Sequence, residues 1–224
     1  MKRIITYSLA FLLLLCQIKS KAQVLNWAKL DNTKPHHIQS GFGIDYGTVF
    51  SFGYSHSQTL LGMPLMLNFL ASKPSGKDQF DDFKFNIGFQ WQLVNVRQFK
   101  TIVKIHGIYR QFENTVVRLN NFGSDFSATT GFFSRHFFIA GELGFDKAIV
   151  THFNHTEKYK NSFPEVNNGW YEPSTGGNFY YGFQTGTSLG NLDISIRVGK
   201  ILTQDFKSTP FIPLYALLGI NINL

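Results

Sequence analysis

The sequence predicts an all-β protein, an antiparallel up-and-down transmembrane β-barrel, from three observations. Apolar and polar residues alternate along segment after segment, aromatic residues dominate the apolar positions, and long polar connections alternate with short turns. Residues 83–93 show the alternation best, since one parity consists of Phe83, Phe85, Ile87, Phe89, Trp91 and Leu93. Residues of one parity share a face of a strand. The segment is also long enough to cross a bilayer, which takes about 9–11 tilted residues.

Composition supports one domain built of strands. The chain has 224 residues, of which 16% are aromatic and only 16% charged, with 20 glycines and 24 phenylalanines. Such a mixture suits many short, twisted strands. Cys16 is the sole cysteine. It lies in a segment that we expect to be removed, so a disulfide, a cysteine nucleophile and a zinc-thiolate site are excluded from the mature chain.

Residues 1–22 have the features of a secretory signal peptide. Lys2 and Arg3 are followed by an apolar stretch at residues 8–16, and Ser20 and Ala22 occupy the −3 and −1 positions of a cleavage site. The mature chain would start at residue 23. Alternative interpretations are a lipoprotein cysteine at position 16, where the preceding leucine is larger than a lipobox prefers, and a permanent anchor helix.

The net charge gives little support to nucleic-acid binding. The formal charge is +7, but the first 22 residues hold four basic residues and no acid, which leaves 17 basic and 14 acidic residues. The remaining excess of +3 is spread along the chain. We therefore expect no nucleic-acid partner.

We expect residues 23–37 to form a periplasmic lead segment and residues 38–224 to form the barrel. His36 and His37 close the lead segment and are interpreted as solvated linker rather than metal ligands. A tight hairpin near residues 45–47 would divide the first alternating segment and give ten strands, with eight as the alternative.

The connections predict how the barrel is oriented. Long connections are expected at residues 73–82, 114–125, 151–177 and 202–209, and short turns at 97–98, 134–135 and 190–191. Outer-membrane barrels have short periplasmic turns and longer outside loops. Both ends of the barrel would then lie in the periplasm.

The chain resembles the small outer-membrane β-barrel proteins of Gram-negative bacteria. The residues that carry the resemblance are the signal ending at 21–23, the amphipathic strands, and a last strand with alternating Ala216, Leu218, Ile220, Ile222 and Leu224. That family usually ends in an aromatic residue, where this chain has leucine. The resemblance implies a location in the cell outer membrane, contact with outer-membrane lipid, and recognition of the last strand by the barrel-assembly machinery.

The polar residues that alternate with the apolar ones predict which side chains line the barrel interior. If aromatic side chains face lipid, the interior contains a set of charged residues that we call the lumen charge network: Lys84, Lys100, Lys104, His106, Arg110, Glu142, Asp146, Asp193 and Arg197. A narrow barrel is filled by its side chains, and an unpaired buried charge costs several kcal/mol. We therefore predict a plugged, salt-bridged interior. The cationic excess leaves a narrow, anion-preferring passive pore as the alternative.

The longest predicted loop carries a candidate binding surface. Its aromatic residues are Phe153, Tyr159, Phe163, Trp170 and Tyr171. Exposed aromatics on a loop suit a protein or glycan partner, although packing over the barrel mouth or a place in the interfacial girdle would also account for them. His152, His155 and Glu157 in the same region have no evident fourth ligand, so we predict neither a metal nor a cofactor.

Catalysis finds little support. Some small outer-membrane barrels modify lipid A with a His/Ser/acid group, and the nearest candidates are Ser55, His56 and Ser57. Both serines lie on the face opposite His56. We therefore predict no enzyme but a structural, anchoring or surface-loop binding role, with a pore second and a lipid A-modifying enzyme third. A soluble β-sandwich or lipocalin-like barrel is the alternative fold.

Overall fold

The computed structural model describes residues 24–30, 33–74, 82–173 and 176–224, and the predicted signal peptide lies outside these residues. The described chain is almost entirely strand. Its elements are β1 (His36–Asp45), β2 (Thr48–Leu60), β3 (Met63–Pro74), β4 (Asp82–Val96), β5 (Phe99–Glu113), β6 (Val117–Phe133), β7 (Phe137–His155), α2 (Glu157–Ser162), β8 (Gly169–Tyr171), β9 (Gly177–Leu189), β10 (Leu192–Thr203) and β11 (Leu214–Asn223). Among the described residues, no helix is both long and apolar enough to cross a membrane.

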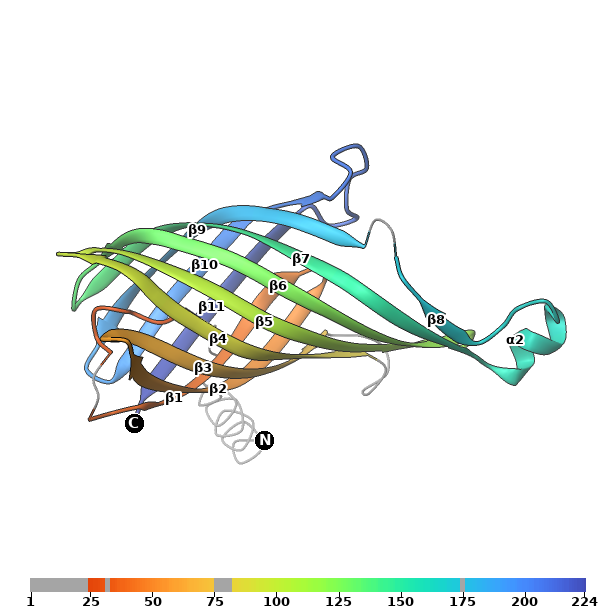
Figure 1. Ribbon diagram of the computed structural model, residues 1–224, viewed down its shortest axis with the longest axis horizontal. Helices are drawn as coiled ribbons and strands as arrows, with labels where there is room; N and C mark the ends of the chain where they lie inside the picture. Colours follow the sequence, from red (N-terminus) through yellow and green to blue (C-terminus); the bar gives the residue numbers. More distant parts are fainter. Residues whose placement is uncertain (1–23, 31–32, 75–81, 174–175) are drawn as a thin grey trace, which may run out of the picture.

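Ten of these strands form a closed antiparallel barrel, as predicted (Figure 1). Each strand pairs with the next around the ring, β7 pairs with β9, and β1 pairs with β11 to close it. The closing register sets Ile38 against Ile222 and Phe42 against Leu218. β8 lies outside the ring and pairs only with the end of β7.

The predicted early hairpin is present and makes the strand count ten rather than eight. β1 ends at Asp45 and β2 begins at Thr48, and the amide of Asp45 donates to the carbonyl of Gly47 at 2.8 Å. Tyr46 between them has a φ of 59°. This left-handed conformation is uncommon for a residue with a side chain and is typical of tight turns.

The barrel has a short-turn end and a long-loop end. Two or three residues connect β2 to β3, β4 to β5, β6 to β7 and β9 to β10, and β1 begins and β11 ends at this same end. The long connections lie at the other end, after β3, β7 and β10. Two connections there are short, at residues 46–47 and 114–116.

Two predicted loops are wrong. Residues 114–125 were expected to be a loop, but β6 begins at Val117; residues 151–177 were also expected to be irregular, but β7 continues to His155 and the segment contains α2 and β8. The long ends of β6 and β7 pair with each other, from Val117 opposite His155 to Asn121 opposite Thr151. They project beyond the rest of the barrel and carry α2 at their tip (Figure 1). We call residues 117–121 and 151–155, with α2 and β8, the arm.

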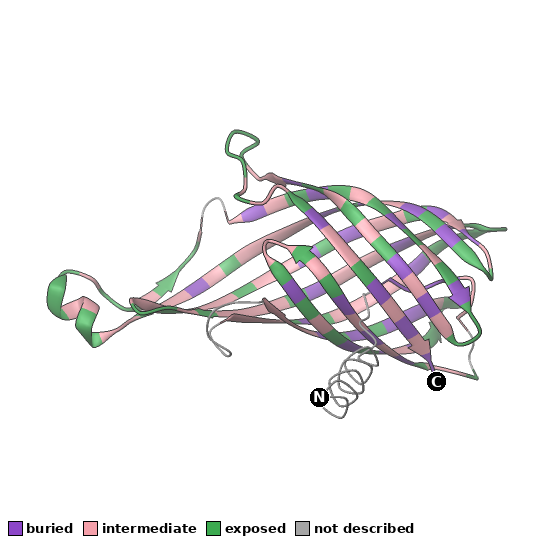
Figure 2. Ribbon diagram, turned by 180° about the vertical axis from the view of Figure 1, so that it is seen from behind, coloured by how far each residue is buried: buried purple, intermediate pink, exposed green. Residues whose placement is uncertain are grey.

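The barrel is apolar outside and polar inside. Along β4, Asn86 and Gln92 are buried, whereas Phe85 and Ile87 on either side of Asn86, and Leu93 next to Gln92, are exposed. The same alternation appears as bands along the other strands (Figure 2). The exposed residues form an outer apolar belt that includes Phe42, Phe50, Phe52, Phe69, Phe85, Ile87, Phe126, Ile139, Leu143, Phe179, Tyr181, Phe183, Ile196, Val198 and Leu218. The buried polar residues include His37, Gln39, Ser55, Asn68, Asn86, Gln92, His106, Asp125, Glu142, Gln184, Asp193, Ser195, Asn221 and Asn223.

Candidate functional site: a filled lumen and an exposed arm

A layer of charged and tyrosine side chains crosses the middle of the lumen. Lys104 Nζ lies 2.7 Å from Asp125 Oδ2, and the hydroxyl of Tyr180 donates to Asp125 Oδ1 at 2.7 Å. Arg197 Nε donates to Glu142 Oε1 at 2.5 Å, and Tyr215 donates to the same oxygen at 2.5 Å. Each carboxylate thus has both a cation and a phenol as partners. We call these six residues the ion-pair layer.

The two tyrosines also bind the arginine through their rings. The Arg197 guanidinium lies 5.4 Å from the centroid of the Tyr180 ring and 4.8 Å from that of Tyr215, within the range of a cation–π contact. Glycines make room for both rings: a Cβ on Gly144 would clash with Tyr180, and a Cβ on Gly182 would clash with the Tyr215 hydroxyl. Glycines on β7 and β9 therefore leave the space that the two tyrosine rings occupy.

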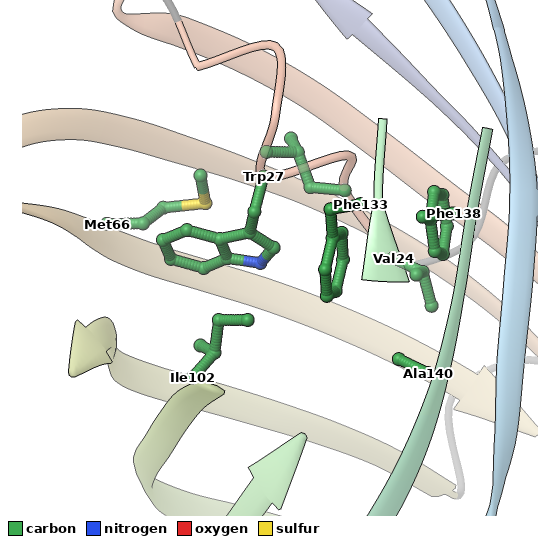
Figure 3. Packing of buried hydrophobic residues seen from close by; sticks show 8 residues of the cluster. Val24, Trp27, Met66, Ile102, Phe133, Phe138 and Ala140 are labelled. Carbon is green, nitrogen blue, oxygen red and sulfur yellow. The ribbon is translucent and has the colours of Figure 1, made fainter. Parts of the chain in front are cut away.

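A second closure lies at the short-turn end, where residues 24–30 enter the lumen; we call this segment the plug. Trp27 is 6% exposed and belongs to a cluster with Val24, Leu25, Met66, Ile102, Phe133, Phe138 and Ala140. Figure 3 shows the indole of Trp27 beside Met66 and Phe133. The predicted lead segment is thus partly inside the barrel, in a collar of inward-facing apolar side chains.

Polar contacts fix the plug in place. The Asn26 amide donates to the carbonyl of Ser134 at 2.8 Å and to the hydroxyl of Ser188 at 2.9 Å. Lys29 Nζ lies 3.5 Å from Asp193 Oδ1. Asn26 and Asp193 are fully buried, so these contacts satisfy groups that water does not reach.

The structure brings part of the predicted lumen charge network together. Lys104, Glu142 and Arg197 meet in the ion-pair layer, and Asp193 pairs with the plug. The other members are distributed along the lumen. Lys100 donates to Asn95 at 2.7 Å near the short-turn end, and Arg110 pairs with Asp82 at 3.1 Å near the long-loop end.

Lys100 forms no ion pair among the described residues, and neither do the remaining three members of the predicted network. Buried His106 lies 3.4 Å from the Asn68 amide. Asp146 accepts hydrogen bonds from Tyr46 at 3.3 Å and Asn178 at 3.4 Å. The ammonium of Lys84 has no ion-pair partner within the part of the chain that the structure describes, although it lines the same hollow as Asp146.

Hollows along the lumen are small and become smaller toward the plug. The largest, near the long-loop end, has a volume of about 240 Å³. A hollow of about 70 Å³ reaches the ion-pair layer, and one of about 30 Å³ lies between that layer and Val24. A water molecule occupies about 30 Å³ of liquid. The hollow between the two closures is thus about the size of one water molecule.

Sequence reasoning missed Asp125, Tyr180, Tyr215 and the plug. Asp125 was placed at the end of a predicted loop, and the two tyrosines were not among the predicted lumen residues. One signal was present: Met66, Ile102 and Phe138 are apolar residues at positions of the inward parity, close to the short turns. Apolar side chains inside a polar lumen require an apolar filler, and Trp27 supplies it.

The arm carries the predicted loop surface, divided between two faces. Phe153 meets Tyr171 edge to face at 5.1 Å, and rings continue through His155 to Tyr159 and Phe163. Trp170 lies apart from them. Its ring centroid lies 4.8 Å from that of His152 and 5.9 Å from that of Phe122. Trp170 and Tyr171 are consecutive residues of β8, so their side chains point to opposite faces.

The face with Phe153 and Tyr171 is hollowed. A shallow hollow of about 500 Å³ is lined by Thr151, Phe153, His155, Glu165, Val166, Asn167, Tyr171 and Pro173. Tyr171 and Phe163 are about half exposed. The local fold supports this face: Thr156 caps α2 through the Tyr159 amide, and its own amide donates to the carbonyl of Val116 at 2.9 Å.

The barrel wall separates Ser55 from His56, two of the residues considered as catalytic candidates. Ser55 is fully buried and hydrogen-bonds Gln39 and Asn68 in the lumen, whereas His56 is on the outer parity beside His36. No nucleophile–base pair exists between Ser55 and His56. Within residues 24–30, 33–74, 82–173 and 176–224, no three His, Cys, Asp or Glu side chains are grouped to hold a metal ion.

Comparison with known protein families and with curated proteins finds no match to the chain.

Proposed function

We propose that the protein is an outer-membrane β-barrel that is closed to passive flow and presents the arm as a binding surface outside the cell. The single observation that carries this proposal is the inversion of the barrel, which has aromatic and aliphatic side chains outside and charged side chains within. Ile87 is 67% exposed and Phe183 68% exposed, while Asp193 is fully buried.

The outer apolar belt supports a hydrocarbon environment. Apolar patches on soluble proteins rarely exceed a few hundred Å², whereas this belt continues around the ring. A closed barrel also satisfies every backbone group between neighbouring strands, which is the requirement for strands within a bilayer. If the short turns lie in the periplasm, the arm lies outside the cell.

Membrane fractionation tests the location. We expect the full-length protein to sediment with the outer membrane, to resist extraction by carbonate at high pH, and to be released by detergent. Release into the periplasm without detergent would contradict the proposal and support a soluble barrel.

The two closures support a barrel without passive conductance. The plug covers the short-turn end and the ion-pair layer crosses the middle, so an ion would have to displace paired, hydrogen-bonded side chains. A narrow anion-preferring pore is the competing function. Recording in planar bilayers separates them: we expect no steady channel current, and a current carried by anions would favour the pore.

The arm supports the binding role, since Phe163, Trp170 and Tyr171 are exposed on an extension of the sheet in which β6 and β7 remain paired. The partner would be a protein or a glycan. Crosslinking and co-purification from cells should recover it with the intact protein. Tyr171→Ala should abolish recovery, whereas Phe211→Ala in the exposed loop between β10 and β11, outside the arm, should retain it. Equal recovery with both variants would contradict a surface centred on Phe153 and Tyr171.

A further inference from the structure

The hollow near the long-loop end is lined by charges of both signs, and we call it the vestibule. Its wall includes Asp45 and Tyr46 at the end of β1, Lys84 on β4, Arg110 on β5, and Asp146 and Lys147 on β7. Toward the short-turn end it narrows against the ion-pair layer. The vestibule is therefore a chamber closed at its inner end.

Two of the three bases stand side by side. Lys84 and Arg110 are direct partners in the β4–β5 register. Like charges at directly opposed positions repel each other. Asp82 compensates Arg110, at 3.1 Å, but among the described residues no acid forms an ion pair with Lys84. This part of the wall can stabilise a further negative charge.

The two acids lie elsewhere around the ring. Asp146 accepts hydrogen bonds from Tyr46 and Asn178, both neutral donors. Asp45 lines the same hollow, and no described side chain hydrogen-bonds its carboxylate. This part of the wall can stabilise a positive charge.

We propose that the vestibule binds a small zwitterion of the amino-acid or dipeptide class. Its carboxylate would lie against Lys84 and Arg110, and its ammonium group against Asp45 and Asp146. The volume of about 240 Å³ lies below the range of about 300–1,000 Å³ typical of sites for drug-sized ligands, which limits the ligand to a few residues. A zwitterion also compensates both parts of the wall, whereas a singly charged ligand leaves one of them uncompensated.

Binding to the full-length protein in detergent micelles tests the proposal, with glycylglycine as the probe and saturation-transfer NMR as the readout. N-acetylglycylglycine and glycylglycinamide each lack one charge, and we expect each to bind at least about tenfold more weakly. Equal affinity for the three compounds, or no binding of glycylglycine at millimolar concentration, would overturn the proposal.

Variants locate the bound probe. Lys84→Met and Asp45→Asn should each weaken glycylglycine binding by about tenfold or more. Lys100→Met removes the same charge from the lumen wall at the short-turn end, outside the vestibule, and should leave the affinity unchanged. Circular dichroism checks that each variant is folded. Unchanged affinity in folded Lys84→Met and Asp45→Asn would show that the probe binds elsewhere and that the assignment is wrong.

Discussion

At the residue scale, the interior of the barrel depends on paired charges that have left water. Glu142 is buried and holds Arg197 and Tyr215 together. Taking two ions out of water costs several kcal/mol per ion, and only good geometry compensates for this cost. A change that removes one partner leaves the other charged and buried.

Removal of Glu142 should therefore destabilise the barrel more than removal of the whole pair. We expect Glu142→Leu to lower the free energy of unfolding by about 3–5 kcal/mol, and the double variant Glu142→Leu/Arg197→Met to recover much of that loss. Urea titration of the protein in lipid vesicles measures both. Additive losses in the double variant would show that the two residues are not coupled.

A surface carboxylate behaves differently. Asp205, in the loop between β10 and β11, accepts hydrogen bonds from the Thr203 hydroxyl at 2.7 Å and from the amides of Lys207 and Ser208 at 3.0 and 3.1 Å. These donors, the Thr203 hydroxyl first, hold the pKa of Asp205 below its usual value.

The loop should accordingly keep its structure in mild acid. Because the pKa of Asp205 is lower in the folded loop, the ionised carboxylate stabilises the loop fully above the ordinary aspartate pKa of about 3.9. This stabilisation is lost only as the pH falls through the lower pKa of the folded state. An NMR titration of the Lys207 and Ser208 amides should show a midpoint below about 3.9. A midpoint at or above that value would contradict the assignment.

The inward or outward direction of each side chain could be predicted at this scale, but its partners could not. Alternation assigns Lys104, Glu142 and Arg197 to the lumen, since parity depends only on neighbours in sequence. Which acid meets which base depends on register and on distance across the ring. Lys104 forms its ion pair with Asp125, a residue that we had expected to lie in a loop.

At the element scale, tertiary pairing overrode local signals in the arm. Residues 114–125 are rich in Asn, Gly and Ser, and these residues predict a loop. The segment nevertheless pairs with β5 on one side and β7 on the other. Backbone hydrogen bonds to strands on both sides compensate for the weak strand propensity of this segment. Its own sequence does not reveal these partners, so the pairing could not be predicted from it.

β8 depends on fewer contacts and should respond to a single substitution. It contains three residues that pair only with β7, and Trp170 covers His152 and Phe122. We expect Trp170→Ala to speed amide hydrogen exchange in residues 169–171 by about tenfold, since an aromatic contact contributes about 0.5–1.5 kcal/mol. Phe163→Ala, at the far end of α2, should leave this exchange unchanged; equal acceleration by both would contradict the contact.

At the scale of the whole molecule, strand count and closure followed from the sequence, whereas the filling of the short-turn end did not. The count required only the hairpin at residues 45–47 and the alternation of long and short connections. The plug depends on a collar assembled from β3, β5, β6 and β7. These strands meet only after the ring has closed, so inward apolar residues on each strand indicate an apolar filler but do not identify residues 24–30 as the segment that supplies it.

The plug should stabilise the closed barrel. Trp27→Ala would leave a cavity between Met66 and Phe133, and we expect it to lower the free energy of unfolding by about 3–5 kcal/mol, as for other buried aromatic residues. Urea titration in vesicles measures the loss. Leu61→Ala in the exposed β2–β3 turn serves as the control and should change stability by about 0.5 kcal/mol or less. If Trp27→Ala lowered the free energy of unfolding by only about 0.5 kcal/mol or less, as the control does, the result would contradict a packed plug.

The proposed membrane location depends on which face of each strand meets hydrocarbon. The sole cysteine is Cys16, within the predicted signal peptide, so single cysteines can be placed at will in the mature barrel. Nitroxide labels at Phe85→Cys, Asn86→Cys and Ile87→Cys in lipid vesicles test the orientation by electron paramagnetic resonance. We predict that labels at positions 85 and 87 collide with oxygen dissolved in the bilayer and are shielded from a water-soluble nickel complex, while the label at 86 is shielded from oxygen. Labels at 85 and 87 that collide freely with the nickel complex would contradict the membrane-embedded, inverted barrel.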